Sequence, residues 1–255
     1  MAIGNKTKVI TAFVMDFETG GLDCTKCAAT QISIHAVRLD NFEVMDSLNL
    51  YFYPYKKKDG AKKRRVLRSK YENEDDNDGE LMEYSEAAEK VSGITMKKLY
   101  DDGTDIEEAC QMIIDFVVKN TFNVSRAFKP ILVGQNILFD IGFMQQIMTY
   151  TGKWGDFCKL FRTHKDFNGN EQIYYLDTII LAQLAMSHDK SVESYKLELV
   201  AERLGIDLDD AHDADADVTA TADVVRVLTS RMRSDDLDSS VTFQKAEKTR
   251  EHFKI

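Results

Sequence analysis

The sequence predicts an α/β domain with a mixed central sheet, in which the first three strands run antiparallel and helices flank the sheet. Apolar and alternating segments typical of β-strands occupy residues 8–55. Beyond residue 80, helical patterns alternate with short apolar strands. A set of strands followed by alternating helices and strands indicates a sheet with both antiparallel and parallel neighbours.

The three antiparallel strands are expected near the amino terminus. Residues 8–18 are apolar and partly β-branched, as in a buried strand. Residues 29–39 place apolar side chains at alternate positions, and residues 44–55 repeat that pattern after a turn-like segment. Together these segments predict a three-stranded meander.

Helices and further strands fill the rest of the chain. The helix expected over residues 83–95 ends near Gly93. The helix over residues 104–122 begins with a capping box formed by Thr104 and Glu107. The later elements are strands at residues 130–135 and 173–178, and helices at residues 136–150, 178–187, 194–206 and 215–233.

A chain of 255 residues suits one large domain. We expect that domain to span residues 1–233, followed by a charged tail or peripheral helix at residues 234–255. No segment approaches the roughly 18 apolar residues of a membrane span, and the amino terminus lacks the apolar stretch of a signal peptide. The sequence therefore predicts a cytoplasmic protein with no membrane partner.

Charge is distributed unevenly along the chain, which carries a net charge of −10. Residues 56–70 contain nine Lys or Arg and one Asp, whereas residues 71–80 contain six acids and no base. This insert, residues 56–80, is interpreted either as a basic arm that binds phosphates by releasing counterions or as a disordered loop whose halves attract each other. Composition favours neither interpretation.

Cysteines are few. Cys24 and Cys27 form a C-x-x-C among four cysteines in all. The pair would be half of a zinc site or a redox pair, but the chain has no second pair of this kind to complete a zinc site. A loop with two thiols is the simpler interpretation.

Acidic residues interrupt two apolar patterns. Asp16 and Glu18 lie two residues apart at the end of the first strand, so their side chains project side by side. Like charges so placed repel unless a cation lies between them. Asp140 shares a helix face with Ile137 and Met144, so a carboxylate interrupts a core-facing stripe. A buried charge must be paired or must bind a metal.

Alternating aspartates open the last predicted helix, in the segment AHDADADV at residues 211–218. A rotation of about 100° per residue places Asp217 in line with Val224, on the face expected to pack against the sheet. Asp215 points nearly the opposite way and is expected to be solvated. Asp213 precedes the first full turn, where an acid caps a helix and meets its dipole favourably.

These acids belong to three motifs, which are D-x-E in MDFETGGLD, N-x-x-F-D in GQNILFDIGF and H-x4-D in HDADAD. Their order and spacing resemble those of the DEDDh, or DnaQ-like, exonucleases, the group that includes the proofreading epsilon subunit of bacterial DNA polymerase III. The resemblance extends from about Lys8 to Arg231. It implies an RNase H-like exonuclease fold.

The resemblance assigns chemistry to single residues. Those matching the family's metal ligands are Asp16, Glu18, Asp140 and Asp217. His212 matches its general base, and Gln135 stands where many relatives have His. Carboxylate oxygens suit two Mg²⁺ or Mn²⁺ ions, which in such sites activate water and stabilise the departing oxygen. The reaction implied is the release of 5′-mononucleotides from a 3′ end, with His212 taking the proton of the water.

The resemblance also implies contacts to substrate. Backbone and an apolar wedge just after the first motif would meet the terminal nucleotide, and nearby aromatic rings are candidates for stacking on bases. For Phe143, helical spacing favours the alternative of a core position. Asp177 resembles a recurrent family acid but is expected to cap the helix that follows it. The substrate-binding candidates are Phe17, Thr19, Gly20, Leu22, Asn136 and Phe143.

The leading functional prediction is a metal-dependent 3′–5′ exonuclease that acts on single-stranded DNA or frayed 3′ ends in proofreading or repair. A polymerase or another replication protein is the candidate partner. An exoribonuclease or oligoribonuclease is the nearest alternative, because discrimination rests on contacts to the 2′-OH. A non-catalytic nucleic-acid-binding subunit is the second alternative, disfavoured because all of the matching acids and the histidine are present.

Overall fold

The computed structural model describes residues 10–58, 79–122, 128–208 and 213–230. A mixed sheet lies at its centre, formed by β1 (Thr11–Thr19), β2 (Ala29–Arg38), β3 (Val44–Tyr51), β4 (Ile131–Gly134) and β7 (Tyr175–Asp177) in the order β3-β2-β1-β4-β7. β1, β2 and β3 pair antiparallel, whereas β4 pairs in parallel with β1 and β7 pairs in parallel with β4. The predicted antiparallel meander within a mixed sheet is therefore confirmed.

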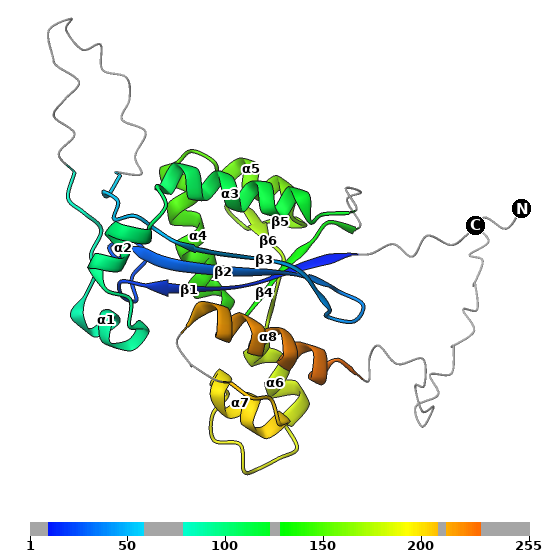
Figure 1. Ribbon diagram of the computed structural model, residues 1–255. Coiled ribbons are helices and arrows are strands. Elements are labelled where there is room, and N and C mark those ends of the chain that lie inside the picture. Colours follow the sequence, from blue (N-terminus) through cyan, green and yellow to red (C-terminus); the bar gives the residue numbers. More distant parts are fainter. Residues whose placement is uncertain (1–9, 59–78, 123–127, 209–212, 231–255) are drawn as a thin grey trace, which may run out of the picture.

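Helices cover both faces of this sheet (Figure 1). They are α1 (Glu86–Ser92), α2 (Met96–Asp102), α3 (Ile106–Lys119), α4 (Ile137–Tyr150), α5 (Trp154–Leu160), α6 (Thr178–Met186), α7 (Leu197–Leu204) and α8 (Ala214–Leu228). α3, α4 and α5 lie on one face, and α6, α7 and α8 lie on the other. A small hairpin, β5 (Thr163–Lys165) with β6 (Glu171–Ile173), lies beside α5.

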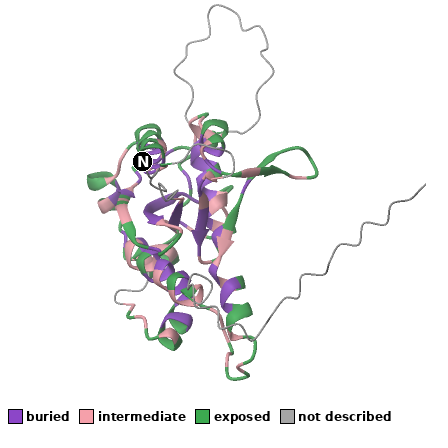
Figure 2. Ribbon diagram, turned by 90° about the vertical axis from the view of Figure 1, so that its right-hand side faces the viewer, coloured by how far each residue is buried: buried purple, intermediate pink, exposed green. Residues whose placement is uncertain are grey.

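The period-two alternation of β1 divides its side chains between two cores. Phe13 and Met15 enter the larger cluster with α3, α4 and α5, where the ring of Phe13 meets that of Phe116 edge-on at 6.0 Å. Ala12 and Val14 enter the cluster under α8. Figure 2 shows the strands as the buried centre of the molecule, with exposed residues on the outer helix surfaces. β1, β2 and β4 are thus buried on both faces, whereas the edge strand β3 is partly exposed.

Helix ends follow from local sequence, with one correction. Gly93 ends α1 in the left-handed region at φ 68°, as predicted. The predicted capping box of α3 is wrong, because the carboxylate of Asp105, not the hydroxyl of Thr104, accepts the hydrogen bond from the Glu107 N–H. The backbone of Thr104 instead pairs with the end of β3, because its N–H donates to the Tyr51 carbonyl at 2.8 Å.

Several short elements were not predicted from the sequence. They are α2, α5 and the β5–β6 hairpin, whose helices have seven residues and whose strands have three. Elements of this length span too few periods for a hydrophobic pattern to identify them.

The charged insert leaves the domain at two neighbouring points. The Lys57 N–H donates to the Glu80 carbonyl at 2.8 Å, and the Met82 N–H donates to the Tyr55 carbonyl at 3.0 Å. Residues 59–78 themselves lie outside the described residues, as do residues 231–255. The interpretations of the insert and of the tail, and the domain boundary at residue 233, therefore stay predictions. Among the helices that the structure describes, none is long and apolar enough to cross a membrane.

Candidate active site

Three carboxylates meet where β1 ends. Asp16 and Glu18 project from the same face of β1, and Asp217 approaches them from the first turn of α8. One oxygen of each lies within 4.8 Å of the others. The predicted convergence of these three acids is thus present in the fold, although they come from opposite ends of the chain.

The packing of α8 differs from the sequence-based prediction. Its face against the sheet carries Val218, Ala222 and Val225. Val224, on the stripe predicted to face the sheet, instead packs in a separate cluster with α6 and α7. Periodicity identifies an apolar stripe but cannot say which neighbour it meets, and α8 has apolar residues on two sides. Asp217 reaches the site because it lies between these two packed faces.

Asp140 completes the acidic group from the opposite side of the sheet. It lies in the first turn of α4 and is only 2% exposed. One of its oxygens accepts a hydrogen bond of 3.0 Å from the Phe17 N–H, which fixes the carboxylate against β1. The sequence-based prediction of a buried carboxylate on this helix is confirmed.

The site raises the proton affinity of its own acids. Burial, followed by the charges of Asp140, Asp217 and Glu18, raises the pKa of Asp16 well above its usual value. Burial and then the charges of Asp217 and Asp213 raise the pKa of Glu18 to about 8. Burial likewise raises the pKa of Asp140, although the hydrogen bond from Phe17 opposes the shift. A bound cation would relieve this repulsion by favouring the ionised form of each acid.

A cleft opens beside these carboxylates. It encloses about 570 Å³, and its walls include Asp16, Asp217, Asn136 and Lys196. Gln135 connects two segments beside the cleft. Its amide nitrogen donates to the Tyr195 carbonyl at 2.8 Å, and its amide oxygen accepts from the Thr178 hydroxyl at the start of α6. The cleft therefore has a carboxylate floor and a lysine at its wall.

Asn136 and Asp177 join the starts of α4 and α6. Asn136 occupies the predicted cap position of α4 in the left-handed region at φ 54°, but its side chain makes no capping bond. Its N–H donates instead to the Asp177 carboxylate at 3.2 Å. Asp177 also caps α6, as predicted, by accepting from the Ile179 N–H at 2.9 Å.

The loop after β1 offers substrate contacts at three of the predicted positions. The Leu22 side chain is 89% exposed. Gly20 has no room for a side chain, because a Cβ there would lie 2.3 Å from the Glu83 carbonyl oxygen. Thr19 is partly buried and donates its hydroxyl hydrogen to the Gly21 carbonyl at 2.9 Å. The roles of these residues stay predictions.

The predicted stacking role of two aromatic rings is wrong. Phe17 is 5% exposed and Phe143 is fully buried. The ring of Phe17 lies parallel to that of Phe52 at 6.2 Å and also contacts Phe143. Because both rings are packed in the core, neither has a free face on which a base could stack. The core position favoured by helical spacing is therefore correct for Phe143.

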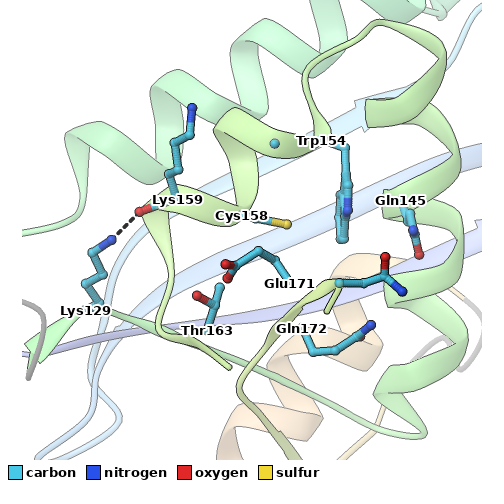
Figure 3. A pocket seen from close by; sticks show the side chains of 10 residues that line it. Lys129, Gln145, Trp154, Cys158, Lys159, Thr163, Glu171 and Gln172 are labelled. Atoms are coloured by element: carbon cyan, nitrogen blue, oxygen red, sulfur yellow. Dashed lines mark hydrogen bonds between the residues drawn. The ribbon is translucent and has the colours of Figure 1, made fainter. Parts of the chain in front are cut away.

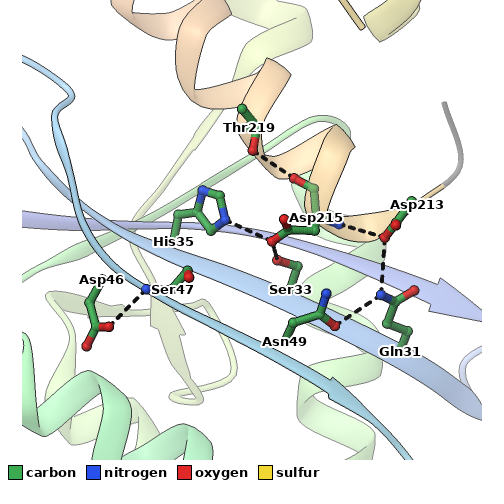
Figure 4. A network of polar contacts seen from close by, with 9 residues as sticks. All are labelled: Gln31, Ser33, His35, Asp46, Ser47, Asn49, Asp213, Asp215 and Thr219. Carbon is green, nitrogen blue, oxygen red and sulfur yellow. Dashed lines mark hydrogen bonds and ion pairs between the residues drawn. The ribbon is translucent and has the colours of Figure 1, made fainter. Parts of the chain in front are cut away.

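Asp215 is solvated in part, as the sequence predicts, because its side chain is 48% exposed, but it also contacts the sheet. It accepts hydrogen bonds from the Ser33 hydroxyl at 2.9 Å and from the His35 ring at 3.0 Å, both on β2 (Figure 4). Asp213 caps α8 as predicted and also accepts from the Gln31 amide at 3.2 Å. The prediction was incomplete because it used only the rotation about the helix axis. That rotation does not reveal the row of polar side chains that β2 presents to the start of the helix.

A second, larger cavity of about 670 Å³ lies between α4, α5 and the β5–β6 hairpin. Figure 3 shows the Trp154 indole directed into it. Glu171 is the one carboxylate in its described lining, so it lacks the acid cluster that a metal centre needs. The lining residues are Lys129, Gln145, Trp154, Gly155, Cys158, Lys159, Thr163, Asn170, Glu171 and Gln172.

Two remaining predictions concern residues near the site. His212, the predicted base, lies outside the described residues. Cys24 and Cys27 carry free thiols in the loop after β1, and Gln146 donates to the backbone carbonyls of both. The interpretation as a loop with two thiols stays a prediction.

Comparison with known proteins identifies the family. Residues 13–225 match the RNase T family of exonucleases. The chain belongs to this exonuclease family. The predictions of a DEDDh-type nuclease and of an enzyme are thereby confirmed, while the likeness to the epsilon subunit in particular stays a prediction. For an exonuclease of this family, the carboxylate cluster implies dependence on a divalent metal.

Solved structures of exonuclease I share the fold. E. coli exonuclease I with a dT13 oligonucleotide superposes with a TM-score of 0.58 at 18% identity, over 88% of this chain and 42% of the other. Exonuclease I from Methylocaldum szegediense gives 0.56 at 21% identity, over 87% and 41%. The chain thus spans about two fifths of the length of these structures. The likeness confirms the RNase H-like arrangement of sheet and helices.

An ExoI/SSB-Ct complex gives a TM-score of 0.59 at 17% identity, over 88% of this chain and 42% of the other. A search of curated protein sequences finds no match.

The polar row on β2 is the part of the site that sequence reasoning missed. Gln31, Ser33 and His35 alternate with the apolar Ile32 and Ile34. The alternation was recognised, but it was used only to predict a strand. Polar residues on a strand that becomes buried on both faces are a signal of interior hydrogen bonding.

Proposed function

We propose that this chain is a 3′–5′ exonuclease that releases 5′-mononucleotides from the 3′ ends of DNA. The observation that carries the proposal is the convergence of Asp16, Glu18 and Asp217 beside a cleft that Asp16 and Asp217 line, with Asp140 buried next to them. A protein that only bound nucleic acid would have no use for acids that repel both one another and the phosphates.

The donor set fits two Mg²⁺ or Mn²⁺ ions held by Asp16, Glu18, Asp140 and Asp217. All of the donors are hard carboxylate oxygens, and none of the cysteines belongs to a metal-binding group in the described part of the chain. When bound, such ions lower the pKa of a water molecule and stabilise the oxygen that leaves phosphorus. Their positive charge would also lower the raised pKa values of Asp16 and Glu18.

The chain's own residues hold the reacting groups. The Phe17 N–H fixes one oxygen of Asp140, which leaves the other oxygen for a ligand. His212 matches the general base of the family in sequence, and an imidazole can take the proton of the attacking water near neutral pH. Its place one residue before the α8 cap puts it close to Asp217 along the chain.

The cleft supplies contacts for the terminal nucleotide. Exposed Leu22 would act as an apolar wedge, and the bare backbone at Gly20 would allow close approach. Asn136 lines the cleft, where its side-chain amide would reach polar groups of the nucleotide. Lys196 in the cleft wall would pair with a backbone phosphate.

DNA is the proposed substrate because exonuclease I structures of the same fold hold dT13 and dA16 oligonucleotides. RNA stays the alternative, since sugar discrimination depends on contacts to the 2′-OH. A cytoplasmic location, a role in proofreading or repair, and a polymerase partner stay predictions. The ExoI/SSB-Ct complex suggests a single-stranded DNA-binding protein as another partner to test.

The test is a cleavage assay on 5′-labelled single-stranded DNA and RNA of one sequence, with Mg²⁺ or Mn²⁺. We expect DNA to shorten from its 3′ end in single-nucleotide steps, and RNA to shorten more slowly. Chelation by EDTA and the His212→Ala substitution should each suppress cleavage. The matched control is Asp223→Asn, on the same helix, where Asp223 pairs with Arg226.

Each outcome has a distinct meaning. Faster shortening of RNA would replace DNA by RNA as substrate and keep the chemistry. Cleavage that survives EDTA would contradict the metal mechanism. No shortening of either polymer would overturn the proposed activity and favour the nucleic-acid-binding alternative.

A further inference from the structure

We infer that Ser33, His35 and Gln31 on β2 are positioning residues, which set the depth and rotation of the first turn of α8 and thereby place Asp217 against Asp16 and Glu18. This inference rests on the proposed function, because it concerns the same carboxylate site. It assigns a task to residues that belong to none of the sequence motifs.

Strand register brings the polar row next to the catalytic acids. In the antiparallel pair, Ser33 lies opposite Asp16, and Gln31 lies opposite Glu18. Directly opposed residues of antiparallel strands point to the same face. The row on β2 is therefore the lateral neighbour of the acid row on β1, on the face that α8 covers.

The alternating aspartates of α8 divide between these two rows. Asp217 reaches the acids of β1. Asp215 accepts from Ser33 at 2.9 Å and from His35 at 3.0 Å, and Asp213 accepts from Gln31 at 3.2 Å (Figure 4). Asp213 and Asp215 thus contact β2, while Asp217 lies against the acids of β1. Contacts to two adjacent strands fix the start of the helix in two directions.

The Asp215 contact is a specific one. A single carboxylate oxygen accepts from both donors, and because a carboxylate only accepts, the bonded Nε2 of His35 carries the hydrogen. The His35 ring is buried, and its Nδ1 has no hydrogen-bond partner among the residues that the structure describes. A buried polar side chain with one interior contact has little reason to be there apart from that contact.

The contact bears directly on the metal site. Asp215 is two residues from Asp217 on the same rigid turn, so a helix start that shifts at Asp215 shifts Asp217 with it. Apolar packing at Val218 and Val225 holds the helix on the sheet but leaves sliding and rotation less restricted. Hydrogen bonds of fixed direction supply that restriction.

The experiment measures Mn²⁺ binding by electron paramagnetic resonance, together with kcat and KM on single-stranded DNA. Substitutions His35→Leu, Ser33→Ala and Asp215→Ala should each weaken Mn²⁺ binding by about 10-fold, as loss of groups that orient ligands commonly does. kcat should fall while KM changes little. The double variant Ser33→Ala/Asp215→Ala should lose no more Mn²⁺ affinity than Asp215→Ala alone, because Asp215→Ala already removes the hydrogen bond between Ser33 and Asp215.

A conservative variant separates positioning from folding. In His35→Gln, the side-chain amide nitrogen occupies nearly the place of Nε2 and can donate to Asp215, so Mn²⁺ binding should recover to near the wild-type value. Controls are Ser47→Ala, which lies opposite His35 on β3 but is exposed, and Asp223→Asn on α8. Thermal unfolding of each variant identifies any that does not fold.

The outcomes that overturn the inference are clear. Wild-type Mn²⁺ affinity in folded His35→Leu and Asp215→Ala would overturn it, and so would a His35→Gln protein as impaired as His35→Leu. Should His35→Leu fail to fold, the milder Ser33→Ala decides by the same measure. If the wild-type protein itself binds no Mn²⁺, the proposed function fails first and this inference with it.

Discussion

The two faces of the central sheet carry different chemistry. Beneath α3, α4 and α5 the core is rich in aromatic rings, with Phe13 packed between Phe116 and Phe161 at centroid distances of 6.0 and 5.8 Å. Beneath α8 the same strands present small residues such as Ala12 and Val14, and then acids and hydrogen-bonding groups. Large side chains fill the first face, whereas the second face combines small side chains with acids and hydrogen-bonding groups.

This difference separates stability from function within a single sheet. Large buried rings contribute most of the apolar contact on the face under α3, α4 and α5, to which the site adds only Asp140 at the start of α4. Small side chains on the other face let α8 approach closely, so that its acids reach those of β1. The acids cost stability when no cation is bound, because their burial and mutual charge oppose ionisation. Apolar burial elsewhere in the fold, including the aromatic face, offsets that cost.

Removal of one acid should have the largest effect. We expect Asp217→Asn to lower kcat/KM by about 1,000-fold, because loss of a metal ligand removes several kcal/mol of stabilisation of the transition state. The metal-free variant should also unfold at a higher temperature than the wild type, since one repelling charge is gone. Steady-state assays and thermal scans in EDTA measure the two effects. Activity within tenfold of wild type would remove Asp217 from the site.

Truncation on the aromatic face should act on stability alone. Phe13→Ala should lower the free energy of unfolding by about 3–5 kcal/mol, because Phe13 is fully buried. Urea unfolding measures this loss. The folded variant should keep kcat within a few-fold of wild type. Phe167→Ala, at an exposed ring, is the matched control and should change stability by less than about 0.5 kcal/mol. A large fall in kcat for Phe13→Ala would show that the faces are not independent.

Metal-free stability should decline as the pH rises. The pKa of Glu18 is about 8 in the folded protein against an ordinary value of 4.5. Between these values the folded state retains a proton that the unfolded state releases, so the free energy of unfolding falls with increasing pH across that window. Urea unfolding in EDTA at pH 5, 6, 7 and 8 measures the slope. Glu18→Gln should reduce the slope and saturating Mg²⁺ should flatten it, because Asp16 and Asp140 also have raised pKa values in the metal-free protein. A wild-type slope of zero would contradict the raised pKa.

The smallest effect is expected at the rim of the cleft. Leu22→Ala should raise KM about fivefold with little change in kcat, corresponding to about 1 kcal/mol of lost apolar contact with the terminal nucleotide. Leu184→Ala, at an exposed position on α6, is the control and should leave KM unchanged. Equal KM values for the two variants would remove Leu22 from the substrate contacts.

The sequence was sufficient for the order of the main elements because long periodic segments dominate them. The meander, the helix that carries Asp140 and the helix that carries Asp217 were all predicted, and family motifs pointed to the acids that converge. Short elements such as α5 were missed because seven residues span only two helical turns.

The errors at the site have a common physical cause. Asp215 and the packing of α8 were each predicted from one element considered alone, and Phe17 was predicted from the family resemblance. Phe17 is buried because Phe52 and Phe143 come from elsewhere in the chain, and Asp215 is held because β2 presents Ser33 and His35. Local patterns say which side of an element is polar, whereas a partner from another element decides what that side touches.

The paired ends of the charged insert suggest a practical use. Lys57 is joined to Glu80, and Tyr55 to Met82, so the chain departs from the domain and returns to it at adjacent points. Glu83 then abuts Gly20 in the loop after β1, close to the carboxylates. A fluorescent protein grafted in place of residues 59–78 would be tethered by two short anchors that lie side by side. Such a fusion would label the enzyme without altering any of its predicted catalytic side chains.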